Sequence, residues 1–554
     1  MKACLLAPGP EPAGIPELPG NADDLIRDLA LRPILAAMAA GDEFLLTTAT
    51  DGLLRSLPDP ETIGYRQQIL IDALENAAIV RQLYALTVEA IEGESKIYRG
   101  IFNNYPDAVL RRAIESLTFL MPLLRRLHAL AETGAAGFQS PGFTRFFAMI
   151  TDELGPAYLE TVNTHLKVLK FRAGVLLSAG LGPGNQATGY TLRRSLTRGR
   201  GRICDLFTDL LAYRDRSVLS FQISDRDEGG YRALSVLRDR GINLAANALA
   251  QADDHILDFF TLLRTELGFY VSCLNLNDAL ARSGAPICLP KPEPRHSLPV
   301  LSARGLYEAP LALAEHGPVV GNDLGADGMT LVMMTGANEG GKSTFLRAVG
   351  AAQLMMQAGM FVCADYYSAT ICDGLHTHFK REEDAALRSG KLDEELARMS
   401  TIAGHLRSGS MVLFNESFAA TNEREGSSIS RDVIRALTEA GVRVLFVTHL
   451  YDLAHSLFDR GLPDALYLQA ERRPDGRRTF RLCPGEPTPT SYGEDLYTRI
   501  FTARPHDGAE GGEHPVGTGA AAVEEATELT PARTTSGANA PHGPLSIGRT
   551  SRHA

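Results

Sequence analysis

The first half of the chain has apolar side chains spaced about 3.6 residues apart, the period of an amphipathic helix. The clearest example runs from Tyr65 to Ile91. Similar segments cover residues 107–132, 144–177 and 232–282. Most of them exceed the roughly 8 to 20 residues of an ordinary globular helix, which predicts long packed helices or kinked pairs. Gly and Pro interrupt residues 180–230, where we expect a strand at 218–224.

The pattern changes near Leu301, where short apolar runs replace the helical period. The runs at Leu331–Thr335, Met411–Phe414 and Val442–Val447 fit buried parallel strands separated by helical stretches. The sequence therefore predicts a mixed fold, in which a mainly α-helical half is followed by an α/β half.

The two ends of the chain differ in composition from the rest. Residues 1–20 are rich in Pro and Gly and predict an irregular lead-in. Beyond Arg504 the sequence has almost no large apolar residue, so it cannot bury enough surface to offset its ordering entropy. We therefore expect a helical domain over residues 21–298, an α/β domain over 299–504 and a disordered tail over 505–554.

The overall composition narrows the class of protein. With 554 residues, 44% hydrophobic and 22% charged, the chain can bury large cores. Its seven cysteines form no C-x-x-C pair, which indicates reduced thiols, and no apolar stretch is long enough for a membrane span. These features favour a cytoplasmic protein without a membrane partner. The net charge of −11 means that nucleic acid would have to be bound by a local patch.

The residues from Gly336 to Ser343 match the phosphate-binding motif G-x-x-x-x-G-K-[ST] in full. The motif follows one expected strand and opens an expected helix. Glycines let backbone N–H groups surround phosphate oxygens, and the helix N-terminus adds a favourable dipole. Lys342 would neutralise the β- and γ-phosphates, and the Ser343 hydroxyl is a ligand for Mg²⁺. The motif therefore predicts a site for ATP and Mg²⁺.

Two further strand ends carry candidate catalytic residues. The run Met411–Phe414 ends in Asn415 and Glu416, which resembles a Walker B arrangement with an amide at the metal position. Glu416 fits a general base for water, although a capped strand end with a solvated acid is the simpler interpretation. His449 follows the strand at 442–447 and fits a phosphate sensor, whereas a lone His is more often structural.

Taken in order, the strings GANEGGKST, MVLFNESFAATNEREG and VLFVTHLYDLAH resemble the ATPase domain of the MutS DNA mismatch-repair family. VVGNDL before the loop, SGKLDEELARM at the place of the signature segment and a closing SYG extend the resemblance over about residues 319–493. An ABC or SMC ATPase is the weaker alternative, because no LSGGQ-like string is present. The helical half is similar to the core and lever region of the family.

The resemblance implies an α/β P-loop ATPase domain of the ABC type and a homodimer in which each nucleotide lies against the signature segment of the partner. It implies that Glu416 activates water, that His449 is the sensor and that Asn415 lies with Ser343 at the metal. The residues implied to bind phosphate and Mg²⁺ are Gly336, Asn338, Gly340, Gly341, Lys342, Ser343 and Thr344.

The function implied is ATP binding and hydrolysis coupled to a clamp motion on DNA, in mismatch repair or recombination, with other repair proteins as further partners. Three departures change this expectation. Asn415 replaces an Asp, and the signature segment reads Lys391-Leu392-Asp393 where the family has a Ser-Thr pair. The mismatch-reading domain with its Phe-x-Glu wedge has no counterpart, so mismatch recognition of the usual kind is not expected. The alternative is a nucleotide-gated DNA-binding or scaffold protein with little ATP turnover.

A cluster of arginines in the helical half is the candidate DNA contact. The string TLRRSLTRGRGR has no nearby acid, and guanidinium groups suit a phosphate backbone. The arginines are Arg193, Arg194, Arg198, Arg200 and Arg202. A solvated charged loop is the alternative interpretation. The expected partner is duplex, mismatched or branched DNA, which makes the protein nucleoid-associated.

Overall fold

The computed structural model describes residues 1–9, 18–97, 105–171, 175–185, 187–193, 228–295, 298–314, 319–381 and 390–488. Contacts along the chain define one compact unit, Met1–Tyr497, and a second, Thr498–Ala554, which lies outside the described residues. The tail expected over 505–554 and the strand expected at 218–224 therefore fall outside the described residues as well. Within the described residues, no helix is long and apolar enough to cross a membrane.

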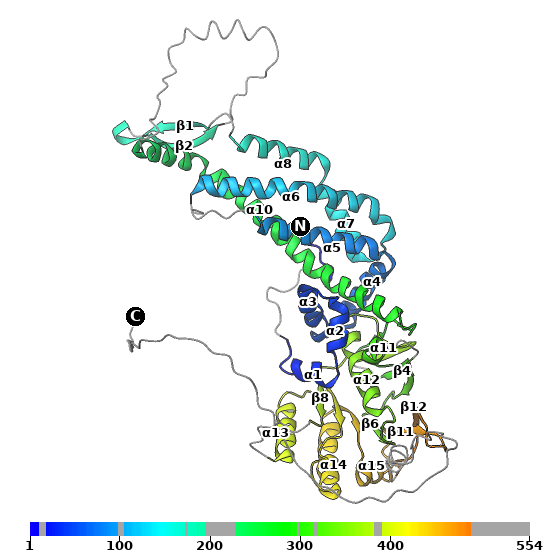
Figure 1. The fold of residues 1–554 in the computed structure, drawn as a ribbon. Coiled ribbons are helices and arrows are strands. Elements are labelled where there is room, and N and C mark those ends of the chain that lie inside the picture. Colours follow the sequence, from blue (N-terminus) through cyan, green and yellow to red (C-terminus); the bar gives the residue numbers. More distant parts are fainter. Residues whose placement is uncertain are drawn as a thin grey trace, which may run out of the picture. The chain divides into compact units, whose positions relative to one another are not determined.

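Helices dominate the first half of the compact unit (Figure 1). They are α1 Ala22–Asp28, α2 Arg32–Ala39, α3 Glu43–Leu54, α4 Pro60–Glu75, α5 Ala77–Ser95, α6 Pro106–Gly134, α7 Pro141–Glu153, α8 Pro156–Leu169 and α10 Glu228–Ala281. The 54-residue helix α10 packs against α5 and α6 along one part of its length and against α2 and α3 along another. The long packed helices predicted from the sequence are confirmed for α6 and α10.

Capping residues explain where several helices begin and end. Asp59 accepts a hydrogen bond from the backbone of α4, and Pro60 follows it at the first helical position. The helical segment predicted over 144–177 is a pair of helices, because Pro156 starts a new helix, and it ends early, at Leu169. Strand β1 (Leu176–Leu181) then pairs antiparallel with β2 (Ala187–Arg193), where the pattern at residue 176 had suggested helix.

A six-stranded sheet forms the centre of the second half, in the order β12-β11-β6-β10-β9-β8. The strands are β6 Leu331–Gly336, β8 Leu375–Phe379, β9 Met411–Asn415, β10 Arg443–Val447, β11 Ala465–Arg472 and β12 Arg478–Pro484. All neighbours are parallel except β12, which pairs antiparallel with β11. The three predicted strands, now β6, β9 and β10, are confirmed, and so is the mixed helical and α/β architecture.

A second sheet of four short strands lies beside the first, in the order β3-β7-β4-β5. Its strands are β3 Lys291–Glu293, β4 Leu301–Leu306, β5 Asn322–Gly325 and β7 Tyr366–Thr370, and the short helix α11 covers Ala309–Ala314. Arg443, at the start of β10, donates hydrogen bonds to the carbonyls of Val300 and Met329 and so ties the two sheets together.

The two faces of the large sheet belong to different hydrophobic cores. On β9, Leu413 joins the core that includes α12 (Lys342–Gln357) and the helical half, whereas Val412 and Phe414 join a smaller core. The smaller core is closed by α13 (Lys391–Ala403), α14 (Glu423–Glu439) and α15 (Tyr451–Phe458). This alternation follows from the two-residue period of a strand. One core is therefore shared by the helical half, α12 and one sheet face.

Candidate nucleotide-binding site

The loop between β6 and α12 has the backbone that a phosphate-binding turn needs. Gly336 and Gly341 have φ values of +104° and +90°, and Glu339 between them has a φ of 57°. At Gly340 the limit is space, because an added Cβ would lie 2.6 Å from the Cβ of Ala470 on the neighbouring strand β11. The glycines of the motif are therefore required here by backbone geometry and by close packing.

Lys342 is the first residue of α12 and is buried, with 6% of its surface exposed. Its Nζ donates hydrogen bonds to the carbonyl oxygens of Gly336, at 2.9 Å, and Ala337, at 2.8 Å. Burial lowers the pKa of this ammonium to about 8, although the nearby Glu416 carboxylate opposes the shift. The cation is thus held inside the loop by two backbone carbonyls, which a phosphate group would replace.

The remaining residues expected to bind phosphate lie along the same turn. Asn338 is partly buried, and its carbonyl accepts a hydrogen bond from Arg478 Nε at 3.1 Å. Thr344 is partly buried in the first turn of α12. Arg478 starts the antiparallel edge strand β12, so a second cation lies against the loop from outside the motif.

Ser343 and Asn415 meet as the sequence suggested for a metal pair. The Ser343 hydroxyl donates to Asn415 Oδ1 at 2.7 Å, across the gap between α12 and the end of β9. Both atoms are hard oxygen donors, which suit Mg²⁺, but neither carries a charge. The pair fits a magnesium ion that arrives with ATP phosphates and keeps much of its water.

Glu416 and His449 are in direct contact. The carboxylate Oε1 lies 2.9 Å from His449 Nε2, and Oε2 lies 3.9 Å from the Nζ of Lys380. The hydrogen bond from His449 and the nearby cations lower the pKa of Glu416, so the carboxylate is ionised at neutral pH. Glu416 also has a φ of 54°, an uncommon conformation for this residue type that is typical of functional sites.

Backbone hydrogen bonds place these side chains in one row along the carboxyl edge of the sheet. The amide of Lys380 donates to Asn415 O at 2.9 Å, and that of Glu416 donates to Val447 O at 2.9 Å. The amide of Thr448 continues the row to Met334 O at 3.1 Å. Ligands of parallel α/β sheets bind at this edge. Lys380 was missed by the sequence analysis, because its strand β8 was not predicted.

A buried histidine connects α13 to the loop that carries Glu416. His378 Nε2 lies 3.0 Å from the carbonyl oxygen of Glu395, and Nδ1 lies 2.7 Å from Ser417 Oγ. Burial lowers the pKa of His378 to about 4, so the ring is neutral, and Nε2–H donates to Glu395 O, because a carbonyl can only accept. The Ser417 hydroxyl lies beside Nδ1 and donates to His378 O at 2.5 Å. The Glu395 carboxylate accepts the Phe418 amide at 2.7 Å.

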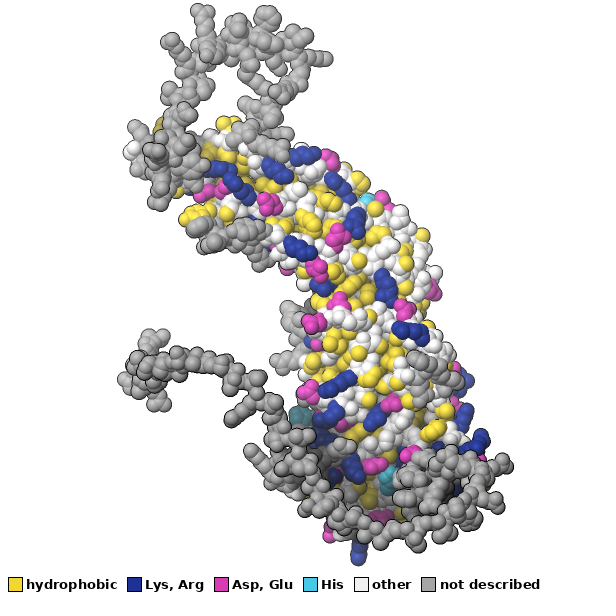
Figure 2. Space-filling view, viewed as in Figure 1, with side chains coloured by type: hydrophobic (Ala, Val, Ile, Leu, Met, Phe, Trp, Pro, Cys, Tyr) yellow, Lys and Arg dark blue, Asp and Glu magenta, His cyan; other side chains and the backbone are white. Residues whose placement is uncertain are grey.

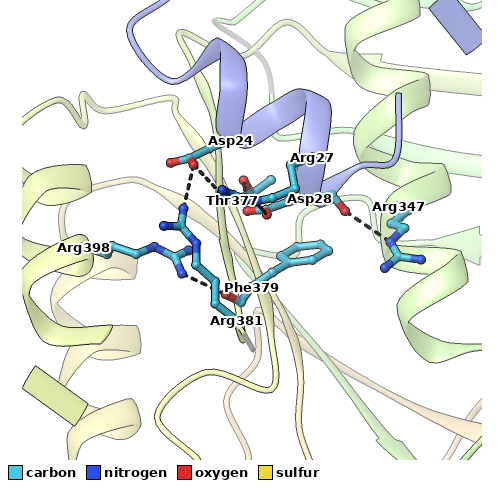
Figure 3. Close-up of polar contacts among 8 residues, drawn as sticks. All are labelled: Asp24, Arg27, Asp28, Arg347, Thr377, Phe379, Arg381 and Arg398. Atoms are coloured by element: carbon cyan, nitrogen blue, oxygen red, sulfur yellow. Dashed lines mark hydrogen bonds and ion pairs between the residues drawn. The ribbon is translucent and has the colours of Figure 1, made fainter. Parts of the chain in front are cut away.

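The N-terminal helix α1 lies against the edge strand β8 of the sheet (Figure 3). Asp24 accepts hydrogen bonds from Arg27 and, at 2.6 Å, from Arg381, which follows β8. The buried Asp28 accepts from Thr377 Oγ1 on β8 at 2.8 Å. Figure 3 also shows Arg398 of α13, whose Nη1 donates to Phe379 O at 2.9 Å. The helical half therefore contacts the sheet beside the strand end that carries Lys380.

The structure describes one of the five candidate DNA-binding arginines. Arg193, at the end of β2, is exposed, and its Nε donates to Ser178 Oγ at 2.8 Å. Arg194, Arg198, Arg200 and Arg202 lie outside the described residues. On the face shown in Figure 2, cationic and anionic side chains of the described residues are interspersed.

Comparison with known proteins identifies both halves of the chain. The family model described as the MutS2 N-terminal domain matches residues 58–283, and the MutS domain V model matches residues 332–478. MutS protein homolog 4 of Mus musculus is 26% identical over 296 residues, which are 50% of this chain and 29% of that protein. The human MutS protein homolog 4 is 24% identical over 325 residues, 56% of this chain and 33% of that protein.

A DNA mismatch repair protein MutS from Chloroflexus aurantiacus is 32% identical over 184 residues, which are 32% of this chain and 19% of that protein. The chain thus spans a third or less of the length of these curated relatives. The resemblance found in the sequence is confirmed in both halves, and the chain belongs to the MutS family.

Proposed function

We propose that this protein is an ATPase that couples ATP binding and hydrolysis to the binding of DNA, in repair or recombination. The observation that carries the proposal is the convergence of three groups at one sheet edge. These are Lys342 in its loop, the Ser343–Asn415 pair at 2.7 Å and the Glu416–His449 pair at 2.9 Å. Family members named for DNA mismatch repair support the DNA part of the proposal.

Each residue of the site has a distinct role in the proposed phosphoryl transfer. The amides of the loop and the N-terminus of α12 bind the phosphates, and Lys342 releases its two carbonyl partners to neutralise them. Ser343 and Asn415 would hold Mg²⁺ through oxygen atoms, and the bound metal would supply positive charge to the phosphate oxygens. Glu416 orients and deprotonates the attacking water, while His449 fixes the carboxylate and contacts the γ-phosphate.

Coupling to DNA has a physical route through the shared core. Helix α12 begins at the phosphate loop and packs against α3, in the same hydrophobic core as the long helices. Helix α1 also contacts the edge strand beside Lys380. We propose that nucleotide binding moves α12 and these contacts, and that the helical half, acting as one arm of a dimeric clamp, thereby changes its grip on DNA.

Two substitutions test the ATPase. Lys342→Ala is expected to abolish saturable ATP binding in the presence of magnesium. Glu416→Ala is expected to keep ATP binding while hydrolysis falls about 100-fold or more, since general-base groups contribute on this scale. Equilibrium binding of labelled ATP and phosphate release measure the two effects separately. If Glu416→Ala hydrolyses ATP at the parent rate, Glu416 is not the base.

A nucleotide-gated DNA-binding or scaffold protein with little turnover is the second candidate. The neutral Asn415 and the contacts of Glu416 with His449 and Lys380 favour it, because they weaken the metal site and the base. Steady-state phosphate release with and without DNA separates the two functions. Turnover at background level in both conditions, with ATP still bound, would establish the gated protein.

The DNA partner is tested by a binding assay titrated with salt. Homoduplex, mismatched and branched DNA are compared with and without ATP, because phosphate contacts produce a steep salt dependence that base contacts do not. Replacing Arg193, Arg194, Arg198, Arg200 and Arg202 with Gln should reduce the salt slope by up to about 4 or 5 if all five contact phosphates. An unchanged slope would remove this cluster from the interface.

A further inference from the structure

The row of side chains at the carboxyl edge of the sheet contains a lysine that the motifs do not include. Lys380 follows β8, and its amide donates to Asn415 O at 2.9 Å, so its backbone is fixed beside the residue that precedes Glu416. Its Nζ lies 3.9 Å from Glu416 Oε2. Lys380 therefore belongs to the candidate site by position, and a role for it depends on the proposed function.

The charge of the site makes this lysine significant. A metal pair of Ser343 and Asn415 offers Mg²⁺ two neutral oxygens, at the place where a carboxylate would normally add negative charge. With Asn415, the protein attracts the metal less strongly, so more of the phosphate charge must be offset by its own cations. Lys342 is one such cation, Arg478 beside the loop donates to Asn338 O, and Lys380 is available on the Glu416 side of the site.

The side chain of Lys380 has the freedom that such a role requires. It is 42% exposed, and its distance of 3.9 Å from Glu416 is too long for a hydrogen bond. Lysine is a compact point charge on a flexible four-carbon stem, so Nζ can turn from the carboxylate toward a phosphate without backbone movement. Glu395, a second acid within electrostatic reach, already accepts the Phe418 amide at 2.7 Å.

We propose that Lys380 is a second phosphate-binding cation of the nucleotide site, which contacts the γ-phosphate of ATP and reduces the dependence of ATP binding on Mg²⁺. The competing account is a partly exposed ion pair with Glu416, which contributes little to any property. The two accounts predict different ATP affinities when Lys380 is replaced, but the same ADP affinity. Only ATP carries the γ-phosphate that would lie near Glu416 and Lys380.

The test measures the dissociation constants of ATP and ADP, each with Mg²⁺ and with EDTA, for the parent protein and Lys380→Met. We expect the parent to retain ATP binding in EDTA. Lys380→Met should raise the dissociation constant of ATP about tenfold in EDTA, as expected for loss of a charged hydrogen bond, and by less with Mg²⁺. The dissociation constant of ADP should change less than about twofold. Lys380→Arg, which keeps the charge, should recover part of the loss.

Lys291→Met is the matched control, because Lys291 is an exposed lysine paired with Glu293 on β3 of the other sheet. It should bind both nucleotides as the parent does. Equal ATP affinity of Lys380→Met and the parent in EDTA would overturn the role of Lys380, and so would equal losses for ATP and ADP. If the parent itself binds no ATP with Mg²⁺, the proposed function fails instead. Lys342→Ala, which should not bind ATP, gives the signal by which this failure is recognised.

Discussion

In the free protein Lys342 is a buried cation with two carbonyl partners, and its burial should make ATP binding depend on pH. Burial lowers its pKa from an ordinary 10.5 to about 8. A bound triphosphate favours the charged form, so ATP binding must be coupled to proton uptake above this pH. At pH 9 about one tenth of the free protein would carry the charge, which raises the apparent Kd for ATP about tenfold over its value at pH 7.

Isothermal calorimetry at pH 8 to 9, in two buffers with different ionisation enthalpies, measures this proton uptake directly. Lys291→Met provides the control, because that lysine is exposed and belongs to the other sheet, and the variant should show the same pH dependence as the parent. An ATP Kd that stays constant from pH 7 to 9 would mean that Lys342 is already charged in the free protein.

Phe480 is a second residue for which the structure suggests a role. It follows Arg478 on β12, is 49% exposed and has a φ of 60°, and its carbonyl accepts from Asn322 Nδ2 at 3.0 Å. A Cβ added at Gly341 would lie 3.6 Å from Phe480 Cβ, so the aromatic residue is beside the phosphate loop. An exposed ring at this place suits stacking against the base of ATP.

We therefore expect Phe480→Ala to weaken ATP binding about tenfold, within the range of base–aromatic stacking, and to leave binding of inorganic tripolyphosphate unchanged. Competition titrations with both ligands measure the difference. Tyr366→Ala, which removes a partly exposed aromatic residue from β7 in the second sheet, is the matched control. Equal losses for both ligands would indicate a damaged loop and not a lost stacking partner.

Among the secondary-structure elements, helix α13 is joined to the loop after β9 by buried hydrogen bonds. Glu395 is 5% exposed, its carboxylate accepts the Phe418 amide at 2.7 Å, and its carbonyl accepts from the neutral ring of His378. The loop carries Glu416, so we expect the position of this proposed base to depend on α13. In the proposed dimer this helix would lie against the nucleotide of the partner subunit, which would let one site influence the other.

Glu395→Ala is expected to lower the free energy of unfolding by about 1 to 3 kcal/mol, because it leaves the buried Phe418 amide without an acceptor. The kcat for ATP should fall while the Kd for ATP changes little, since the phosphate loop lies on another strand. Ser400→Ala, at an exposed position of the same helix, should change neither quantity. A variant with lowered stability and an unaltered kcat would show that α13 does not position Glu416.

The sequence predicted elements well where one local pattern determines them. β6, β9 and β10 are short apolar runs that are buried on both faces, and their ends were predicted to within about one residue. Kinked pairs were allowed for the long helical segments, but the positions of two breaks were not predicted: Asn76 between α4 and α5, and the Gly155–Pro156 step between α7 and α8. Apolar periodicity continues across such breaks because both helices pack on one core.

At the scale of the whole molecule, contacts between distant segments could not be predicted. Residues 1–9 form no helix or strand, yet Leu5 is fully buried. Its amide donates to Glu266 Oε2 at 2.9 Å, and its carbonyl accepts from the Tyr270 hydroxyl at 2.6 Å. No local pattern reveals partners about 260 positions away. The same reason explains why Lys380 was not connected to Glu416.

The core shared by the helical half and the sheet predicts that they unfold together. A close contact between the two lies at Gly350 in α12, where an added Cβ would lie 2.6 Å from Leu29 Cδ2 and 2.7 Å from Leu413 Cδ1. Leu29 ends α1 and Leu413 belongs to β9, so α12 is packed directly between the two halves. Overpacking here should loosen both halves at once.

Gly350→Val is therefore expected to reduce the free energy of unfolding by about 1 to 3 kcal/mol, the usual cost of overpacking. The midpoint temperature of unfolding is measured with two probes: circular dichroism, which reports mainly on the helices, and the loss of ATP-dependent stabilisation, which reports on the sheet. Both probes should give the same lowered midpoint. Gly64→Ala is the control: an added Cβ meets nothing within 4 Å in the middle of α4, and the change should stabilise the protein by about 0.5 to 1 kcal/mol. If Gly350→Val lowers the transition seen by one probe and leaves the other unchanged, the two halves are not joined by a cooperative core, and nucleotide binding would have to reach the helices through individual contacts such as those of α1.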